Sequence, residues 1–295
     1  MAAGALAEAR GPNRHRVRGR GRFRNWVVYA ALGGALVYTL FPILWMISNS
    51  VKKRGEIMAS PVVWITGNPT LVNYVETFIV RDFFDFMMNS LVVAISVTAI
   101  SLTCGTFTAY GLARFTYFGS FKKHLSFWIL STRMIPPIVT ILPLYILFQN
   151  LGLLDSKLSL IITYTGFNLP FVVWMMKGYF SEIPPELEES AMVDGDTRLG
   201  AMFRIALPLA KPSLAATAIF SFILSWNEML IALILADTSS STTLPIGIAG
   251  RVTQFRTAWG EISAAGFISI IPIIIFAFVV QRHLVRGLSF GAVKG

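Results

Sequence analysis

Two ionisable residues, Arg133 and Glu228, lie inside long apolar stretches of this sequence, and Glu228 directly follows Asn227. An ionisable group in apolar surroundings is costly and by default faces a cavity or a partner. Glu228 could accept hydrogen bonds from the hydroxyl groups of a ligand or couple to an ion, and Arg133 could face an anion. A structural role is the alternative for each residue. Glu228 could hydrogen-bond a neighbouring helix, and Arg133 could bind a carbonyl left free by a nearby proline.

Motifs for catalysis or metal binding are absent from the sequence. It contains no P-loop, no combination of Ser, His and Asp, and no carboxylate pair placed for catalysis. The histidines, His15, His124 and His283, lack metal-ligand spacing. The single cysteine, Cys104, excludes an internal disulfide and a Cys-rich metal site. We therefore expect no catalytic residue, no metal site and no cofactor bound by this chain.

The composition is that of an integral membrane protein. Of 295 residues, 55% are hydrophobic and 14% are charged, whereas a soluble domain carries about 25% charged residues. So few charges cannot cover the surface of a water-soluble fold. The 23 Phe and 7 Trp residues are equally untypical of a disordered chain.

Six apolar stretches approach or exceed the length of about 20 residues that crosses a bilayer, which predicts an all-α, polytopic membrane protein. The first span covers 26–48 and precedes a loop over 49–85. Residues 86–281 form the predicted core, whose five spans cover 86–113, 125–150, 158–176, 212–236 and 262–281. Prolines interrupt the third and sixth of the six spans.

An Arg-rich tail over 1–25 precedes the first span, and a short tail over 282–295 follows the last. Most Lys and Arg residues outside the spans fall on the side of these tails, so the positive-inside rule predicts cytoplasmic N and C termini. The first tail also fits contact with anionic lipid, a mitochondrial presequence or binding to nucleic acid. Because it adjoins a long apolar run, we expect the lipid bilayer as partner and no nucleic acid.

The segment over 182–208, predicted to lie in the cytoplasm, has the pattern of two short helices joined by a turn. Pro184 and Pro185 suit the start of a helix, and Gly195 suits the left-handed residue that ends one. Asp196 or Thr197 can cap the second helix. Two interpretations are open: the segment packs on its own bundle, or it is a rigid lever that docks on a soluble partner.

This segment resembles the loop that marks the membrane subunits of bacterial ABC importers: Glu-Ala-Ala, three residues, Gly, nine residues, Ile, one residue, Leu-Pro. All the spacings are kept, and Ser190 in place of the central Ala is the one departure. The resemblance implies a loop that couples the permease to an ATPase. Its residues here are Glu189, Ser190, Ala191, Asp194, Gly195, Ile205, Leu207 and Pro208.

The C-terminal residues 287–295 are similar to the ending of maltose-type sugar permeases, with Ser289 and Phe290 as departures, and 225–228 also look like that family. The family implies a type I ABC importer permease fold in the bacterial inner membrane. It further implies a heterodimer with a second permease subunit, two ABC ATPase subunits that hold ATP and Mg, and a periplasmic solute-binding protein. Asn227, Glu228 and Arg133 are candidates for the translocation pathway. Rival hypotheses are a self-contained secondary transporter with ion coupling at Glu228 and, more distantly, a membrane-embedded enzyme.

Overall fold

The structure, a computed structural model, describes residues 18–80, 82–115, 119–253 and 257–281. The long helices are α1 (Arg18–Ser50), α4 (Phe83–Arg114), α7 (Lys157–Glu182), α11 (Lys211–Trp226) and α14 (Trp259–Gln281). The shorter helices are α2 (Arg54–Ile57), α3 (Val72–Val75), α5 (Gly119–Ser131), α6 (Pro137–Asn150), α8 (Glu186–Val193), α9 (Arg198–Ala201), α10 (Leu207–Leu209), α12 (Leu230–Leu235) and α13 (Leu244–Ala249). The described residues form no β-strand, so the predicted all-α class is confirmed. The basic tail up to residue 17 and the whole of 282–295 lie outside the described residues.

Among the described residues, four helices are long and apolar enough to cross a membrane: Asn25–Ser50, Phe83–Arg114, Lys157–Glu182 and Trp259–Val280. Two pairs of helices pass the same test together but are bent at a short break. If each bent pair is one span, the number is six, as predicted, but the second pair, Arg198–Leu209 with Lys211–Trp226, does not coincide with the predicted fifth span, 212–236. Within the described residues, the fourth span continues as α7 to Glu182, beyond its predicted end at 176.

The third predicted span, 125–150, is sharply bent and not a continuous helix. Its two parts, His124–Met134 and Pro137–Asn150, meet at 88°. The break falls at Pro136, whose backbone is extended with ψ 132°. A proline lacks the N–H that continues a helix and also disfavours a helical residue before it, so the Pro136–Pro137 pair separates α5 from α6.

The fifth predicted span, 212–236, was expected to be one helix, and that expectation is wrong. Helix α11 ends at Trp226 and α12 begins at Leu230. Side chains at the break compete with the backbone for hydrogen bonds. The Asn227 amide donates to the carbonyl of Ile223 at 2.9 Å, and the Glu228 carboxylate accepts from the N–H of Ile231 at 3.0 Å.

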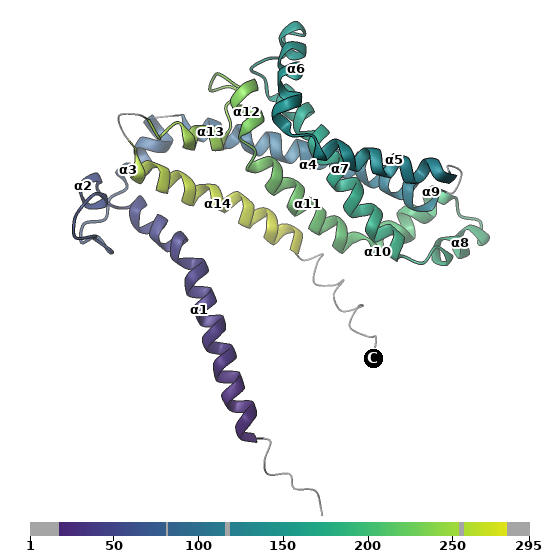
Figure 1. Cartoon of the computed structure of the whole chain (residues 1–295), viewed down its shortest axis with the longest axis horizontal. Coiled ribbons are helices and arrows are strands. Elements are labelled where there is room, and N and C mark those ends of the chain that lie inside the picture. The colour runs from purple at the N-terminus through teal and green to yellow at the C-terminus, as the bar shows by residue number, and fades with distance from the viewer. Residues whose placement is uncertain (1–17, 81, 116–118, 254–256, 282–295) are drawn as a thin grey trace, which may run out of the picture.

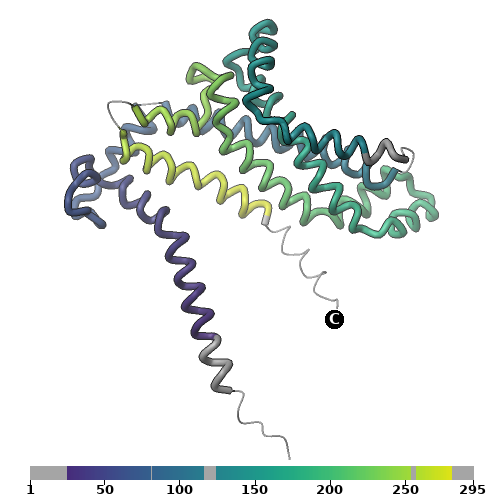
Figure 2. The backbone as a smooth tube through the Cα atoms, viewed as in Figure 1, coloured from purple at the N-terminus to yellow at the C-terminus, as the bar shows by residue number. Residues whose placement is uncertain are grey.

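Helices α4, α7, α11 and α14 run side by side as the body of the bundle (Figure 1). Helix α4 packs closely on α7, because Gly105 leaves no side chain between them. A Cβ atom there would lie 2.6 Å from Cγ1 of Val172. Helix α1 contacts α14, where Met46 lies against Gly266, and its N-terminal part extends away from the bundle (Figure 2).

The bundle has two ends, which we name by the helices that lie there. Helix α4 begins at the α13 end and finishes at the α8 end (Figure 1). At the α13 end, the turn before α7 holds the loop 237–243 through Asp155. Its carboxylate accepts from the N–H groups of Asp237 at 2.9 Å and Thr238 at 3.0 Å, and from the hydroxyl groups of Thr238 at 2.6 Å and Ser241.

Asp155 yields a prediction about pH. Burial by itself would raise the pKa of the Asp155 carboxyl, but the hydrogen bonds that it accepts outweigh burial and hold the pKa below its ordinary value. A carboxyl with a lowered pKa stabilises the fold above its unfolded pKa of about 3.9, and that contribution is lost as the pH falls through the folded pKa. Asp155→Asn should therefore lower the free energy of unfolding by about 1–3 kcal/mol. The difference in stability between the parent and the variant should be constant from pH 8 to pH 5 and should narrow only in stronger acid. Thermal unfolding of the detergent-solubilised protein measures this, and a difference that vanishes at neutral pH would contradict it.

Candidate functional site

The segment 182–208 contains the predicted pair of short helices and the turn. Helix α8 ends at Val193, and Gly195 follows with φ +94°. The N–H of Gly195 donates to the carbonyl of Met192 at 3.2 Å, and the N–H of Asp196 donates to that of Ala191 at 2.9 Å. These bonds form a Schellman motif, which needs a left-handed residue at this place. The predicted role of Gly195 as the end of the helix is therefore what the backbone shows.

Helix α9 begins directly after this turn. The hydroxyl group of Thr197 accepts from the N–H of Gly200 at 3.0 Å and caps the helix, and Asp196 forms an ion pair with Arg204 at 3.2 Å. Helical backbone then continues through a π-helical stretch, Met202–Ala206, to α10. The helical backbone ends at Leu209, one residue after Pro208. The chain then turns by 74° into α11.

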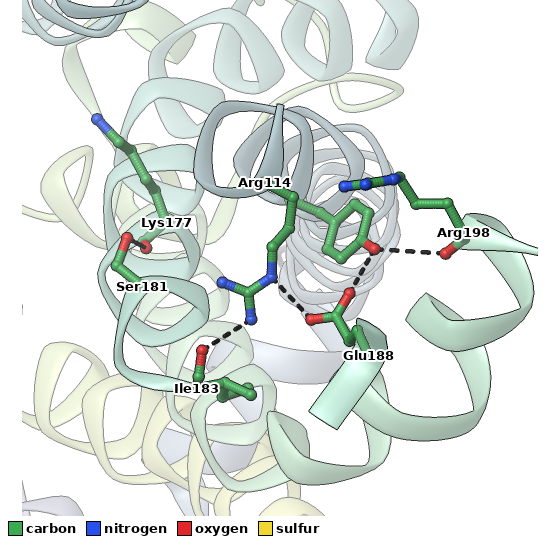
Figure 3. A network of polar contacts seen from close by, with 7 residues as sticks. Arg114, Lys177, Ser181, Ile183, Glu188 and Arg198 are labelled. Atoms are coloured by element: carbon green, nitrogen blue, oxygen red, sulfur yellow. Dashed lines mark hydrogen bonds and ion pairs between the residues drawn. The ribbon is translucent and has the colours of Figure 1, made fainter. Parts of the chain in front are cut away.

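One side of α8 is fixed to the end of α4 by a buried polar network (Figure 3). The Nε of Arg114 lies 2.7 Å from Oε1 of Glu188, in an ion pair whose side chains are 7% and 4% exposed. The Tyr110 hydroxyl donates to Oε2 of Glu188 at 2.5 Å. Arg114 also donates to the carbonyl of Ile183 at 2.9 Å. No local pattern in the sequence marks this partnership, because Arg114 and Glu188 are far apart along the chain.

Other side chains of this segment are uncovered. Glu189 and Ser190 are exposed, as are the apolar side chains of Leu187 (47%), Val193 (87%) and Leu199 (61%). Large apolar side chains exposed outside the predicted membrane spans are candidates for contact with a partner. The two interpretations of the segment are thus compatible: one side packs on the bundle, and the other is available to a partner.

A second group of polar residues lies around a cavity of about 250 Å³ at the break in the fifth span. The lining includes Arg133, Asn168 and Glu228, together with Phe167 and Leu224. The structure thus brings together two of the three residues predicted for the translocation pathway, and Asn227 is not in the lining. Asn168 was missed because an asparagine inside an apolar span carries no charge to mark it.

Each polar group of this cavity has a partner that explains its position. The Glu228 carboxylate accepts from the N–H groups of Ile231 and Ala232 and so stabilises the first turn of α12. The Asn168 amide donates to the hydroxyl group of Ser225 at 3.2 Å. The guanidinium of Arg133 stacks over the ring of Phe171 at 5.0 Å. The structural alternative for Glu228 was a bond to a neighbouring helix, and the bonds seen are instead to the backbone three and four residues further along its own chain.

The described residues hold no group of three or more His, Cys, Asp or Glu side chains that could bind a metal ion.

Comparison with known proteins identifies the family. Residues 101–290 match the family described as the binding-protein-dependent transport system inner membrane component. This chain belongs to that family.

The permease family has well-matched members. The chain is 34% identical to the sulfoquinovosyl glycerol transport system permease protein SmoH of Agrobacterium fabrum over 88% of this chain and 90% of that protein. It is 32% identical to the trehalose/maltose transport system permease protein MalG of Thermococcus litoralis over 88% and 93%. A crystal structure of a bacterial ABC transporter that imports the acidic polysaccharide alginate has the same fold, with a TM-score of 0.72, 23% identity and coverage of 92% and 99%. The permease is thus a sugar ABC importer subunit and an inner membrane protein, as predicted.

Proposed function

We propose that this permease forms part of the pathway for a carbohydrate-type solute and is gated by ATPase subunits through the loop 182–208. The observation that carries the proposal is how α8 is attached, exposed and ended. It is fixed to α4 on one side, uncovered on the other, and ended by a defined turn at Gly195. A helix held in this way moves as a rigid body when a partner displaces it, and the bundle must follow.

The proposal includes a division of labour. The absence of a P-loop supports a place for ATP and Mg on partner subunits, and the family resemblance supports two such ATPase subunits and a second permease that completes a heterodimer. A periplasmic binding protein delivers the solute, and the N and C termini lie in the cytoplasm with α8. The names of the two relatives, for a sulfoquinovosyl glycerol and a trehalose/maltose system, support a sugar or sugar derivative as solute.

Co-purification tests this proposal. The affinity-tagged chain, expressed with the neighbouring genes, should bring down a second permease and an ATPase, and Mg-ATP should drive uptake in vesicles made from that complex. Isolation of the chain with no ATPase under the same conditions would count against it.

Substitutions of Glu228 distinguish the proposed ATP-driven permease from the rival hypothesis of a secondary transporter. Glu228→Gln should leave ATP-driven uptake within about threefold of the parent, because the Gln carbonyl can still accept from the N–H of Ile231. Glu228→Leu removes that acceptor, which costs about 0.5–2 kcal/mol at a helix start, and should lower uptake further. Uptake rates of the reconstituted complex give the comparison. An ion-coupled carrier predicts the opposite pattern, with loss of uptake already in Glu228→Gln.

A further inference from the structure

Helix α4 differs from the other long spans in having no proline. Prolines lie inside α1 (Pro42), α7 (Pro170) and α14 (Pro272), whereas α4 runs for 32 residues without one. A proline removes one backbone hydrogen bond and bends the helix. At 1.5 Å per residue, α4 reaches about 48 Å, longer than the hydrocarbon core of a bilayer, about 30 Å. It is a helix without a proline that joins the two ends of the described bundle.

At the α8 end, Arg114 and Tyr110 attach α4 to the segment 182–208. Arg114 forms the ion pair with Glu188 and donates to the carbonyl of Ile183. The Tyr110 hydroxyl lies within hydrogen-bond distance of the Glu188 carboxylate and of the Arg198 carbonyl, at 2.5 and 3.3 Å. The Tyr110 ring also packs edge-on against Phe180, with ring centres 5.5 Å apart. Because the charged pair is buried, separating it is costly, so a displacement of α8 moves this end of α4 with it.

At the α13 end, α4 holds the loop 237–243. The Asn89 amide donates to the carbonyls of Ser239 at 2.9 Å and Thr242 at 3.0 Å. Its oxygen accepts from the Lys157 ammonium at 2.9 Å. The hydroxyl group of the next residue, Ser90, accepts from the N–H of Leu244 at 2.8 Å. The loop is therefore bonded to the same helix that holds α8 at the opposite end.

The covalent route from α8 to this loop is less direct. It passes through the turn at Gly195, the 74° bend before α11 and the break between Trp226 and Leu230. Each of these places interrupts the helix and can absorb movement, whereas α4 has no such interruption.

We propose that α4 is the strut that carries movement of the coupling helix α8 to the loop 237–243, with Glu188 and Asn89 as its positioning residues at the two ends. This inference rests on the proposed function, in which an ATPase displaces α8. A coupling between two sites acts in both directions. The same strut therefore reports events at the loop, such as docking of the binding protein, to the ATPase.

A cysteine reporter tests the strut without knowledge of the solute. Ser239→Cys places a thiol in the loop, in a Cys104→Ser background, within the complex that co-purifies with the ATPase. The reaction rate of this thiol with a membrane-impermeant maleimide is measured with and without Mg-ATP and vanadate. Vanadate traps nucleotide on the ATPase subunits. We expect this trapped state to change the rate of thiol labelling by about fivefold or more.

Three variants of the reporter chain locate the route. Asn89→Leu removes the two bonds from α4 to the loop carbonyls, and Glu188→Gln weakens the attachment of α8, so in each the ratio of the two rates should fall toward one. Asp155→Asn is the matched control, because it loosens the same loop without touching α4, and its ratio should stay close to that of the parent.

Trapped nucleotide is measured in every sample. An unchanged ratio in Asn89→Leu, or an equal loss in Asp155→Asn, would overturn the strut even though nucleotide is trapped normally. Absence of nucleotide trapping in the parent complex would instead count against the proposed function.

Discussion

Gly195→Val should lower ATP-driven uptake at least tenfold while the chain still inserts in the membrane. The backbone at Gly195 has φ +94°, and a left-handed conformation costs an L-residue about 1–2 kcal/mol, with a higher cost for a β-branched side chain. That strain reduces the population of the native turn by a factor of about 5–30. The space around Gly195 is open, so the effect comes from the backbone and not from a clash.

Gly195→Asn is the control at the same position, because asparagine adopts the left-handed conformation more readily than other residues. It should keep most of the uptake and should still co-purify with the ATPase. Equal uptake by the Val and Asn variants would show that the turn does not need the conformation seen here.

Arg114→Leu should destabilise the permease by about 3–5 kcal/mol, the usual result of removing one partner from a buried ion pair. The carboxylate of Glu188 would then be left buried with only the Tyr110 hydroxyl as a polar partner. Thermal unfolding of the solubilised complex, followed as loss of monodisperse protein, measures the change. We expect the unfolding temperature of the variant to drop by several degrees, or the variant to fail to accumulate in the membrane.

The double variant Arg114→Leu/Glu188→Gln separates charge from packing. Removing the uncompensated charge should restore part of the stability, so the double variant should be more stable than Arg114→Leu alone. A double variant less stable than the single one would mean that Arg114 acts mainly through its bond to the carbonyl of Ile183.

The sequence predicted those parts of the fold that depend on composition and local backbone chemistry. Four of the six apolar stretches coincide with helices long enough to cross a membrane, and Gly195 marked the end of α8, because a left-handed helix end favours glycine. The Pro136–Pro137 pair marked the interruption of the third span. Its bend of 88° could not be predicted, since the angle depends on how α5 and α6 pack on their neighbours.

The long-range contacts were not predictable from the sequence. Glu188 lies between two other glutamates, Glu186 and Glu189, and local rules treat the three alike. Only the position of Arg114 in the folded bundle makes Glu188 the buried one. The break at Asn227 was missed for a related reason: the apolar stretch over 212–236 has the composition of one helix, and the competing hydrogen bonds of Asn227 and Glu228 appear only in three dimensions.

Uptake by vesicles that contain this chain alone is the most direct test of an ATPase-driven permease. The same vesicles prepared with the second permease, the ATPase subunits, Mg-ATP and the loaded binding protein serve for comparison. We expect uptake only in the complete system, and only while ATP is hydrolysed. Uptake of solute by the isolated chain, driven by an ion gradient and insensitive to ATP, would contradict the account.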